Sequence, residues 1–302
     1  MKKMKFRLKA YTVIATKVEI IPDSETKQES IVSAYSSFFR MFEPSKSYVM
    51  KRFCLLFYAL IIAGTAWSQS GMPETFYEKS GMNETPRYSE TIEYCHRLAA
   101  ASGMVTYTTF GKSAQGRDLP LLIVDKDGLS DPAAIHASGR AVLLIEACIH
   151  AGESEGKDAG FMMIRDIIAG KSGKPSVTLD SSFPRPSSDL LKNVTILIIP
   201  IFNVDGHERF GPFNRINQNG PKEMGWRTTA NNLNLNRDFL KADAPEMQEW
   251  LRMFNRWMPD FFIDSHTTDG ADYQYVLTYL MEIYGGMDAG LESWSRDILI
   301  NR

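Results

Sequence analysis

The stretch AVLLIEACIHAGESEGKD, residues 141–158, runs from an apolar segment directly into a histidine and two glutamates. A strand that is apolar along its whole length normally lies inside a sheet and is buried on both faces. Polar groups at the end of such a strand tend to face a crevice rather than open solvent. The stretch therefore predicts a buried strand that ends at a functional site.

Segments on both sides of this stretch alternate between strand-like and helix-like patterns. We expect two strands joined by a turn within 105–125, further strands at 141–150, 193–203 and 259–266, and helices at 85–103, 154–170 and 245–258. Thr85 and Pro86 suit the N-cap and first position of the first helix. This alternation predicts an α/β fold with a mixed, largely parallel β-sheet flanked by helices.

The composition is that of a globular protein that can bury a substantial core, with 302 residues of which 44% are hydrophobic. The net charge of −2 combines a basic segment of residues 1–68 with an acidic remainder, and no basic stripe interleaved with aromatic residues occurs. These features argue against a nucleic acid partner. Cys95 and Cys148 lack the paired spacing of a Cys-ligated zinc site, and we expect Cys148 to be an apolar filler of the buried strand rather than half of a disulfide.

Residues 50–68, MKRFCLLFYALIIAGTAWS, have the layout of a secretory signal peptide, with a basic start, an apolar run and a small-residue exit. The apolar run is too short to span a bilayer, although an uncleaved anchor is the alternative. We therefore expect a secreted or periplasmic protein with no stable membrane span after cleavage. Because export signals normally stand first in a chain, we expect residues 1–49 to be a non-native or disordered extension, and residues 69–302 to form the folded domain.

Polar clusters follow three of the expected strands, and they supply a plausible set of metal ligands. His150 and Glu153 follow the third strand, and His266 follows the fifth. Ligands gather at the carboxyl ends of strands in open α/β sheets, so residues distant in sequence can meet there. Two imidazoles and one carboxylate are the ligands of a hydrolytic zinc that keeps its fourth position open. We expect one Zn²⁺ ion at these three residues, although His-x-x-Glu alone is a common pattern.

Other polar residues have simpler interpretations. We expect His96 on the first helix and His136 in a loop to be solvated, and His207 to be a hydrogen-bonding loop residue. Asp205 is expected to fix a turn. Glu155 suits the N-terminus of a helix, where a carboxylate is favourable.

Five segments in the same order resemble the M14 family of zinc carboxypeptidases: GKSAQGRDLPLLIV (111–124), HAGE (150–153), NVDG (203–206), WRTTANNLNLNRDF (226–239) and IDSH (263–266). The resemblance extends from about residue 85 to the chain end. It implies that Arg227 stabilises the oxyanion and that Asn236 and Arg237 hold the terminal carboxylate of a peptide. A guanidinium stays charged and binds carboxylates bidentately, which suits these roles. The alternative for each arginine is an ordinary ion pair.

The chain departs from the family pattern at two places. Family members often carry Asp where this chain has Asn234, so a partner of a zinc-bound histidine would lack its negative charge. The family's catalytic glutamate and substrate-capping tyrosine lie well beyond the third ligand, and Glu282 and Glu292 are too close to it to match. We therefore expect a C-terminally truncated domain whose sheet is incomplete on that side, with metal binding but weak or no turnover.

The sequence thus predicts a zinc-dependent metallocarboxypeptidase that removes C-terminal residues from peptides. Its expected partners are peptide or protein C-termini, with cell-wall peptides as one option. Two alternatives stay open. One is a zinc deacylase of the succinylglutamate desuccinylase or aspartoacylase type, and the other is a non-catalytic peptide-binding protein. The long Gly/Asn-rich loop and the export signal favour peptides as substrates.

Overall fold

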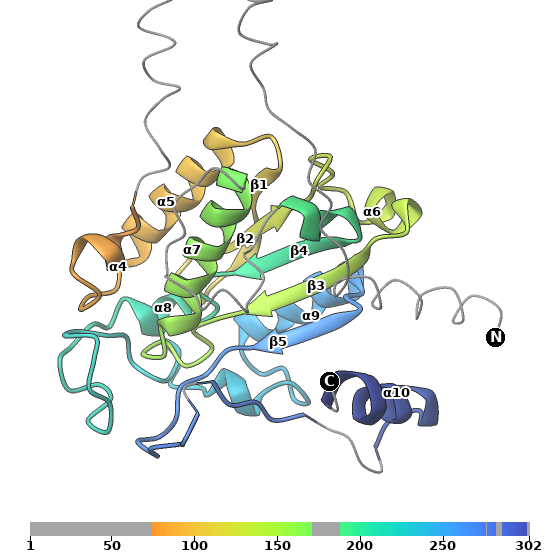
Figure 1. Cartoon of the computed structure of the whole chain (residues 1–302). Helices are drawn as coiled ribbons and strands as arrows, with labels where there is room; N and C mark the ends of the chain where they lie inside the picture. The colour runs from red at the N-terminus through yellow and green to blue at the C-terminus, as the bar shows by residue number, and fades with distance from the viewer. Residues whose placement is uncertain (1–73, 171–187, 276, 282–285, 301–302) are drawn as a thin grey trace, which may run out of the picture. The chain divides into compact units, whose positions relative to one another are not determined.

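The computed structural model describes residues 74–170, 188–275, 277–281 and 286–300 (Figure 1). The expected extension at 1–49 and signal peptide at 50–68 lie outside these ranges. The chain divides into two compact units, of which the first ends at Thr267 and the second is Thr268–Arg302. Within the described ranges, no helix combines the length and the apolar character needed to cross a membrane.

The first unit is built on a five-stranded sheet with strand order β1-β2-β4-β3-β5 (Figure 1). The strands are β1 (Val105–Lys112), β2 (Asp118–Val124), β3 (Ala141–Glu146), β4 (Val194–Ile199) and β5 (Phe261–Asp264). β2 pairs antiparallel with β1 and β4, whereas β3 pairs parallel with β4 and β5. This pairing confirms the mixed α/β sheet. The parallel pairs are those that β3 forms with β4 and with β5.

Helices flank both faces of this sheet (Figure 1). Those of the first unit are α4 (Phe76–Lys79), α5 (Tyr88–Ala101), α6 (Pro132–Ser138), α7 (Glu155–Ala169), α8 (Val204–His207) and α9 (Pro245–Trp257), with 3₁₀ turns η3 (Ser188–Lys192) and η4 (Leu235–Arg237). The second unit contains α10 (Ala289–Trp294) and the π-helical turn η5 (Ser295–Ile300).

The alternation of side chains along the strands divides the core into two layers. On β2, Leu121 faces the layer that α6 and α9 cover, and Leu122 faces the layer of α5 and α7. Trp250 of α9 is the centre of the first layer, where it stacks on Phe254 with 4.8 Å between ring centroids. Burial of such large aromatic side chains anchors α9 to the sheet.

Three expectations about local structure are wrong: the start of the first helix, the end of the third strand and the location of His136. The first helix begins at Tyr88 after an Arg87 cap, because Thr85 instead donates its hydroxyl to buried Asp158 at 2.8 Å. The third strand ends at Glu146, so Cys148 lies beyond it, with a positive φ of 58° and a buried free thiol. Apolar residues 147–149 continue past the point at which the ladder with β4 ends, which explains why the strand looked longer in sequence.

His136 is not in a loop. It lies in α6, which begins after an Asp131 cap with Pro132 at its first turn and ends at Gly139 with φ of 78°. These are standard start and stop signals of a helix. His136 is partly buried, and its Nε2 donates to the carbonyl oxygen of Trp257 at 2.9 Å. The ring therefore links α6 to the end of α9 instead of being solvated.

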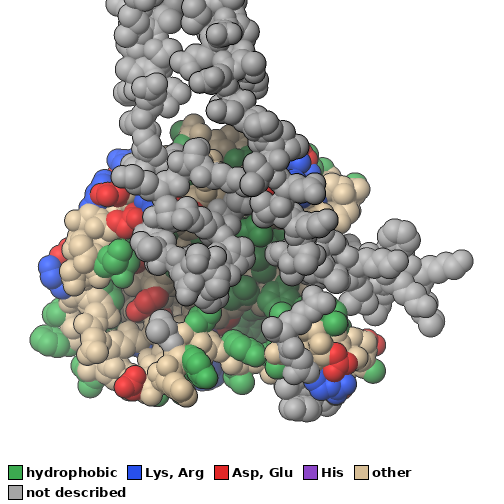
Figure 2. Space-filling model, in the orientation of Figure 1, with side chains coloured by type: hydrophobic (Ala, Val, Ile, Leu, Met, Phe, Trp, Pro, Cys, Tyr) green, Lys and Arg blue, Asp and Glu red, His purple; other side chains and the backbone are tan. Residues whose placement is uncertain are grey.

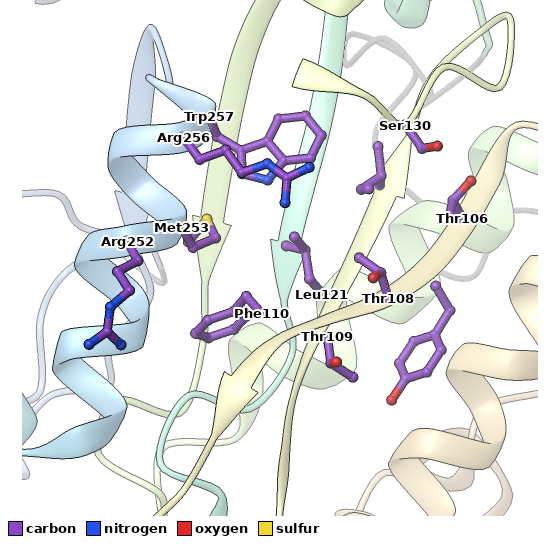
Figure 3. Close-up of a pocket in the computed structure, with 12 residues that line it drawn as sticks. Thr106, Thr108, Thr109, Phe110, Leu121, Ser130, Arg252, Met253, Arg256 and Trp257 are labelled. Carbon is purple, nitrogen blue, oxygen red and sulfur yellow. The ribbon is translucent and has the colours of Figure 1, made fainter. Parts of the chain in front are cut away.

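Where grey atoms leave the first unit visible in Figure 2, Lys and Arg side chains lie close to Asp and Glu side chains. A cavity of about 330 Å³ lies between the edge strand β1 and α9 (Figure 3). Its lining includes Thr106, Thr108, Phe110, Arg252 and Arg256. The cavity is at the β1 edge of the sheet, whereas the expected metal ligands follow β3 and β5.

Candidate metal centre

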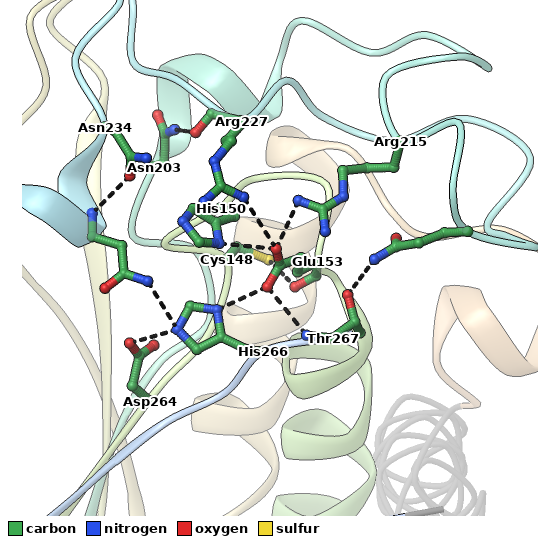
Figure 4. Close-up of polar contacts among 12 residues, drawn as sticks. Cys148, His150, Glu153, Asn203, Arg215, Arg227, Asn234, Asp264, His266 and Thr267 are labelled. Carbon is green, nitrogen blue, oxygen red and sulfur yellow. Dashed lines mark hydrogen bonds and ion pairs between the residues drawn. The ribbon is translucent and has the colours of Figure 1, made fainter. Parts of the chain in front are cut away.

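The structure brings the three expected metal ligands together (Figure 4). His150 Nδ1 lies 2.9 Å from Glu153 Oε1, and His266 Nδ1 lies 2.8 Å from Glu153 Oε2. One ligand atom from each residue lies within 4.8 Å of the others. Both histidines therefore direct the same ring nitrogen at one carboxylate, and the three side chains can reach a common ion.

The parallel strands bring these side chains to one edge of the sheet. Beyond β3, the backbone of Ala147 still bonds to Ile199, and Asn203 bonds to Cys148, which carries the chain toward His150. A tight turn from His150 to Glu153 then leads into α7. β5 pairs with β3 in parallel register, so His266 emerges at the same edge. This is where ligands are expected in an open α/β sheet.

Glu153 is held by positive charge on several sides. The residue is 3% exposed, its Oε1 forms an ion pair with Arg215 at 2.7 Å, and its Oε2 accepts from the backbone N–H of Thr267 at 3.1 Å. Burial alone would raise the pKa of Glu153, but hydrogen bonds from His150 and His266 and the charge of Arg215 hold that pKa well below its ordinary value. The carboxylate is therefore ionised, which is the form that binds metals.

Asp264 forms a hydrogen bond with the third expected ligand, His266. Its Oδ2 accepts from His266 Nε2 at 2.8 Å (Figure 4). The hydrogen bonds to Asp264 and Glu153 raise the pKa of His266 to about 10. A carboxylate in this position fixes the orientation of the ring and increases the basicity of the other nitrogen.

In the described part of the chain, Asn234 makes no hydrogen bond to His150 or His266. Its side-chain oxygen accepts from the backbone N–H of Asn236 at 3.1 Å and caps η4. His150 Nε2 is buried and, within the described residues, has no hydrogen-bond partner. The negative charge expected from position 234 is thus absent at this histidine, and Asp264 supplies such a charge to His266 instead.

A second carboxyl group lies beside Asp264. Glu146, the last residue of β3, is in register with Asp264 on β5 and accepts a hydrogen bond from Trp250 Nε1. Complete burial and the neighbouring charge of Asp264 raise the pKa of Glu146 well above its ordinary value. The raised pKa favours the neutral form of Glu146, which reduces the repulsion between two neighbouring carboxyl groups.

The residues expected to contact substrate lie at different distances from the ligands. Arg227 NH1 is 3.8 Å from Glu153 Oε1, and its side chain is one-third exposed. Asn236 Nδ2 lies 3.4 Å from His266 Nε2. Arg237 is exposed and donates to the carbonyl oxygen of Asn236 at 2.6 Å. Arg227 and Asn236 thus border the ligand cluster, whereas the Arg237 guanidinium contacts its own neighbour.

Two residues that contact the cluster, Asp264 and Arg215, were not predicted from the sequence. Asp264 ends β5 and stands two residues before His266, and in extended chain this spacing places both side chains on one face, which was a usable signal. Arg215 lies in a long loop and has no local pattern that links it to Glu153. Its contact arises only from the folded arrangement.

Two residues outside the cluster were interpreted correctly in part. Asp205 fixes local structure as expected, since it accepts from Ser113 at 2.8 Å and Arg117 at 2.6 Å. His207 is a hydrogen-bonding residue, but it is fully buried in α8 rather than in a loop. Burial and the adjacent charge of Lys157, 3.0 Å away, lower the pKa of His207 to about 3.

An α/β sheet with a His₂Glu cluster at its carboxyl edge defines a candidate metal-dependent hydrolase. The family model of the zinc carboxypeptidases, peptidase family M14, matches residues 91–271, and the chain belongs to this family. The search of curated proteins found no match.

Several solved structures are similar to the chain. A metallo-carboxypeptidase from Burkholderia cenocepacia is 19% identical with a TM-score of 0.45, over 62% of this chain and 42% of that one. A metallo-carboxypeptidase from Pseudomonas aeruginosa is 21% identical with a TM-score of 0.41, over 61% and 40%. Carboxypeptidase A from Helicoverpa armigera is 20% identical with a TM-score of 0.45, over 68% and 50%. The chain thus matches half or less of the length of these proteins.

Proposed function

We propose that the chain is the metal-binding portion of an exported zinc carboxypeptidase, with His150, Glu153 and His266 as the ligands of one Zn²⁺ ion. The observation that carries this proposal is the convergence of the three ligand atoms within 4.8 Å. The donor set fits zinc, which is commonly bound by two histidines and a glutamate in peptidases. When bound, zinc would polarise the scissile carbonyl and activate a water molecule.

The proposed roles of the other residues follow from their charge and position. Arg227 borders Glu153 and keeps a partly exposed guanidinium, which is suited to stabilising negative charge on a carbonyl oxygen. Asn236 and Arg237 are adjacent donors at the rim, and we assign them the free carboxylate of a peptide C-terminus. Selection of a free C-terminus would make the enzyme an exopeptidase.

We further propose that hydrolysis by the 302-residue chain is slow. The M14 resemblance calls for a glutamate general base, and neither Glu282 nor Glu292 matches it. Glu282 lies outside the described residues, and Glu292 lies on α10 of the second unit. Loss of a general base typically reduces the rate by about 10²–10⁴-fold.

The test is a comparison of zinc binding and hydrolysis in three proteins: the wild type, His150→Ala and the control His96→Ala. His96 is an exposed histidine of α5 that packs on Tyr107, away from the cluster. We expect one zinc per chain in the wild type and the control, and substoichiometric zinc in His150→Ala. Unchanged zinc content in His150→Ala would refute the ligand assignment.

Substrate assays separate the remaining readings. We expect slow, zinc-dependent release of the C-terminal residue from a peptide, and no release when the same peptide is amidated. Preferential cleavage of N-acyl amino acids would favour the deacylase alternative. Stoichiometric zinc and peptide binding without any hydrolysis would favour the non-catalytic alternative.

Export and cell-wall peptides complete the proposal. The layout of residues 50–68 supports secretion or transfer to the periplasm. Fractionation of cells that express the natural gene, with sequencing of the mature N-terminus, tests this assignment. Cell-wall peptides with a free C-terminus are the substrates that we would assay first, and a cytoplasmic, uncleaved product would contradict the choice.

A further inference from the structure

The loop that contains Arg215 has an unusual distribution of side chains. Gly211 and Met224 close the loop through a pair of backbone hydrogen bonds of 3.0 and 3.2 Å. Within it, Phe213 and Ile216 are 79% and 88% exposed, whereas Arg215 is only 6% exposed. Arginine is mostly exposed in proteins and is almost never fully buried unless it is paired. The inward position of Arg215 therefore indicates a specific contact.

That contact is with a ligand residue of the metal cluster. Arg215 NH1 lies 2.7 Å from Glu153 Oε1 (Figure 4). The same loop reaches the other side of the cluster, because Gln218 Nε2 donates to the hydroxyl of Thr267, the residue after His266. Two residues of one loop thus hold two parts of the cluster that are far apart in sequence.

The backbone around Arg215 leaves just enough space for its side chain. A Cβ on Gly152, next to Glu153, would lie 2.8 Å from Cγ of Arg215 and 2.7 Å from the carbonyl oxygen of Gly225. A Cβ on Gly225 would lie 2.8 Å from the carbonyl oxygen of Ala151. Because these distances are shorter than ordinary contacts, both positions need glycine for the loop to close over the ligand turn.

We propose that Arg215 is a positioning residue, which fixes the Glu153 carboxylate so that its two oxygens face the two ligand histidines. The inference rests on the proposed zinc site. A glutamate side chain has several rotatable bonds, and the buried ion pair with Arg215 removes that freedom before the ion binds. Groups that orient a metal ligand typically contribute about 10–100-fold to metal affinity.

The test is a zinc titration against a competing chelator with the full chain and three variants. Arg215→Met removes the charge and keeps similar bulk, and Arg215→Lys keeps the charge but loses the planar fork. Arg140→Met is the matched control, because Arg140 is a largely buried partner of buried Asp125 at 3.1 Å and no metal ligand is involved. Circular dichroism melting confirms that each variant is folded at the titration temperature.

We expect zinc affinity to fall by about 10–100-fold in Arg215→Met, to be intermediate in Arg215→Lys and to be unchanged in Arg140→Met. The visible absorption of bound Co²⁺ should change in Arg215→Met and not in Arg140→Met, since it reports ligand geometry. Wild-type affinity in Arg215→Met, or equal losses in Arg215→Met and Arg140→Met, would overturn this inference alone. Failure of the wild type to bind zinc would overturn both the proposed function and the inference.

Discussion

Gly156, in the first turn of α7, controls how closely this helix approaches the segment after β5, which contains the proposed ligand His266. A Cβ at this position would lie 2.6 Å from Cβ of Ser265, the residue between Asp264 and His266. It would also lie only 2.1 Å from the Ser265 hydroxyl oxygen. The hydroxyl can rotate away, but Cβ is fixed to the backbone. Gly156→Ala must therefore move either α7 or the segment 264–266.

The size of the effect follows from these distances. Ordinary carbon–carbon contacts are about 3.5–4.0 Å, so the two elements must separate by roughly 1 Å. Overpacking of this kind costs about 1–3 kcal/mol, against a gain of up to about 1 kcal/mol from replacing glycine by alanine in a helix. Metal–ligand distances tolerate only about 0.2 Å, so displacement of His266 should weaken zinc binding by at least about tenfold.

Gly160→Ala is the control, because it makes the same substitution in the same helix. A Cβ on Gly160 meets its nearest atom, Cγ2 of Ile198, at an ordinary 3.7 Å. Urea unfolding should show Gly160→Ala to be equal to or up to about 1 kcal/mol more stable than wild type, and Gly156→Ala to be less stable than Gly160→Ala by about 1–3 kcal/mol. Equal stability of the two variants, together with wild-type zinc affinity in Gly156→Ala, would refute the reasoning.

Three further predictions test other parts of the molecule. Asp264→Asn should lower zinc affinity by about 10–100-fold in a chelator competition, and an unchanged affinity would exclude its support of His266. Burial raises the pKa of Asp158 from 3.8 to about 6. The wild type therefore loses unfolding free energy as the pH rises from about 4 through about 6. Urea unfolding should show that Asp158→Asn gains on the order of 3 kcal/mol relative to the wild type between pH 4 and pH 7. A stability difference that does not depend on pH would contradict this prediction. Free zinc at about 100 times its dissociation constant should raise the unfolding free energy by about 2.7 kcal/mol, and a chelator should reverse this gain. An unchanged unfolding free energy would argue against a zinc site in the native state.

The positions of the strands were predictable because burial on two faces leaves a direct mark on composition. β2 and β4 are apolar runs for this reason, and both were found. The end of β3 was not predictable, because residues 147–149 are as buried as the strand itself. Apolar composition reports burial, whereas a strand ends where its hydrogen-bonded ladder ends. α6 was missed although Asp131, Pro132 and Gly139 carry its start and stop signals.

The ligand cluster was predictable for a different reason. Each of its members follows an apolar strand, and the topology of an α/β sheet brings such positions to one edge. The structure confirms that His150, Glu153 and His266 meet there. The role of Gly152 could not be read from sequence, because its backbone is not in a conformation that requires glycine. What requires glycine is the approach of Arg215 and the backbone of Gly225, which are distant in sequence.

The charges around Glu153 explain how this carboxylate can be buried. Glu153 is ionised and nearly inaccessible to solvent, so its burial must be offset by positive charge. Arg215 supplies such a charge at 2.7 Å. The guanidinium charge of Arg215 persists at any relevant pH. If the proposed site binds zinc, the ion would enter a geometry that Arg215, a residue of a distant loop, already maintains.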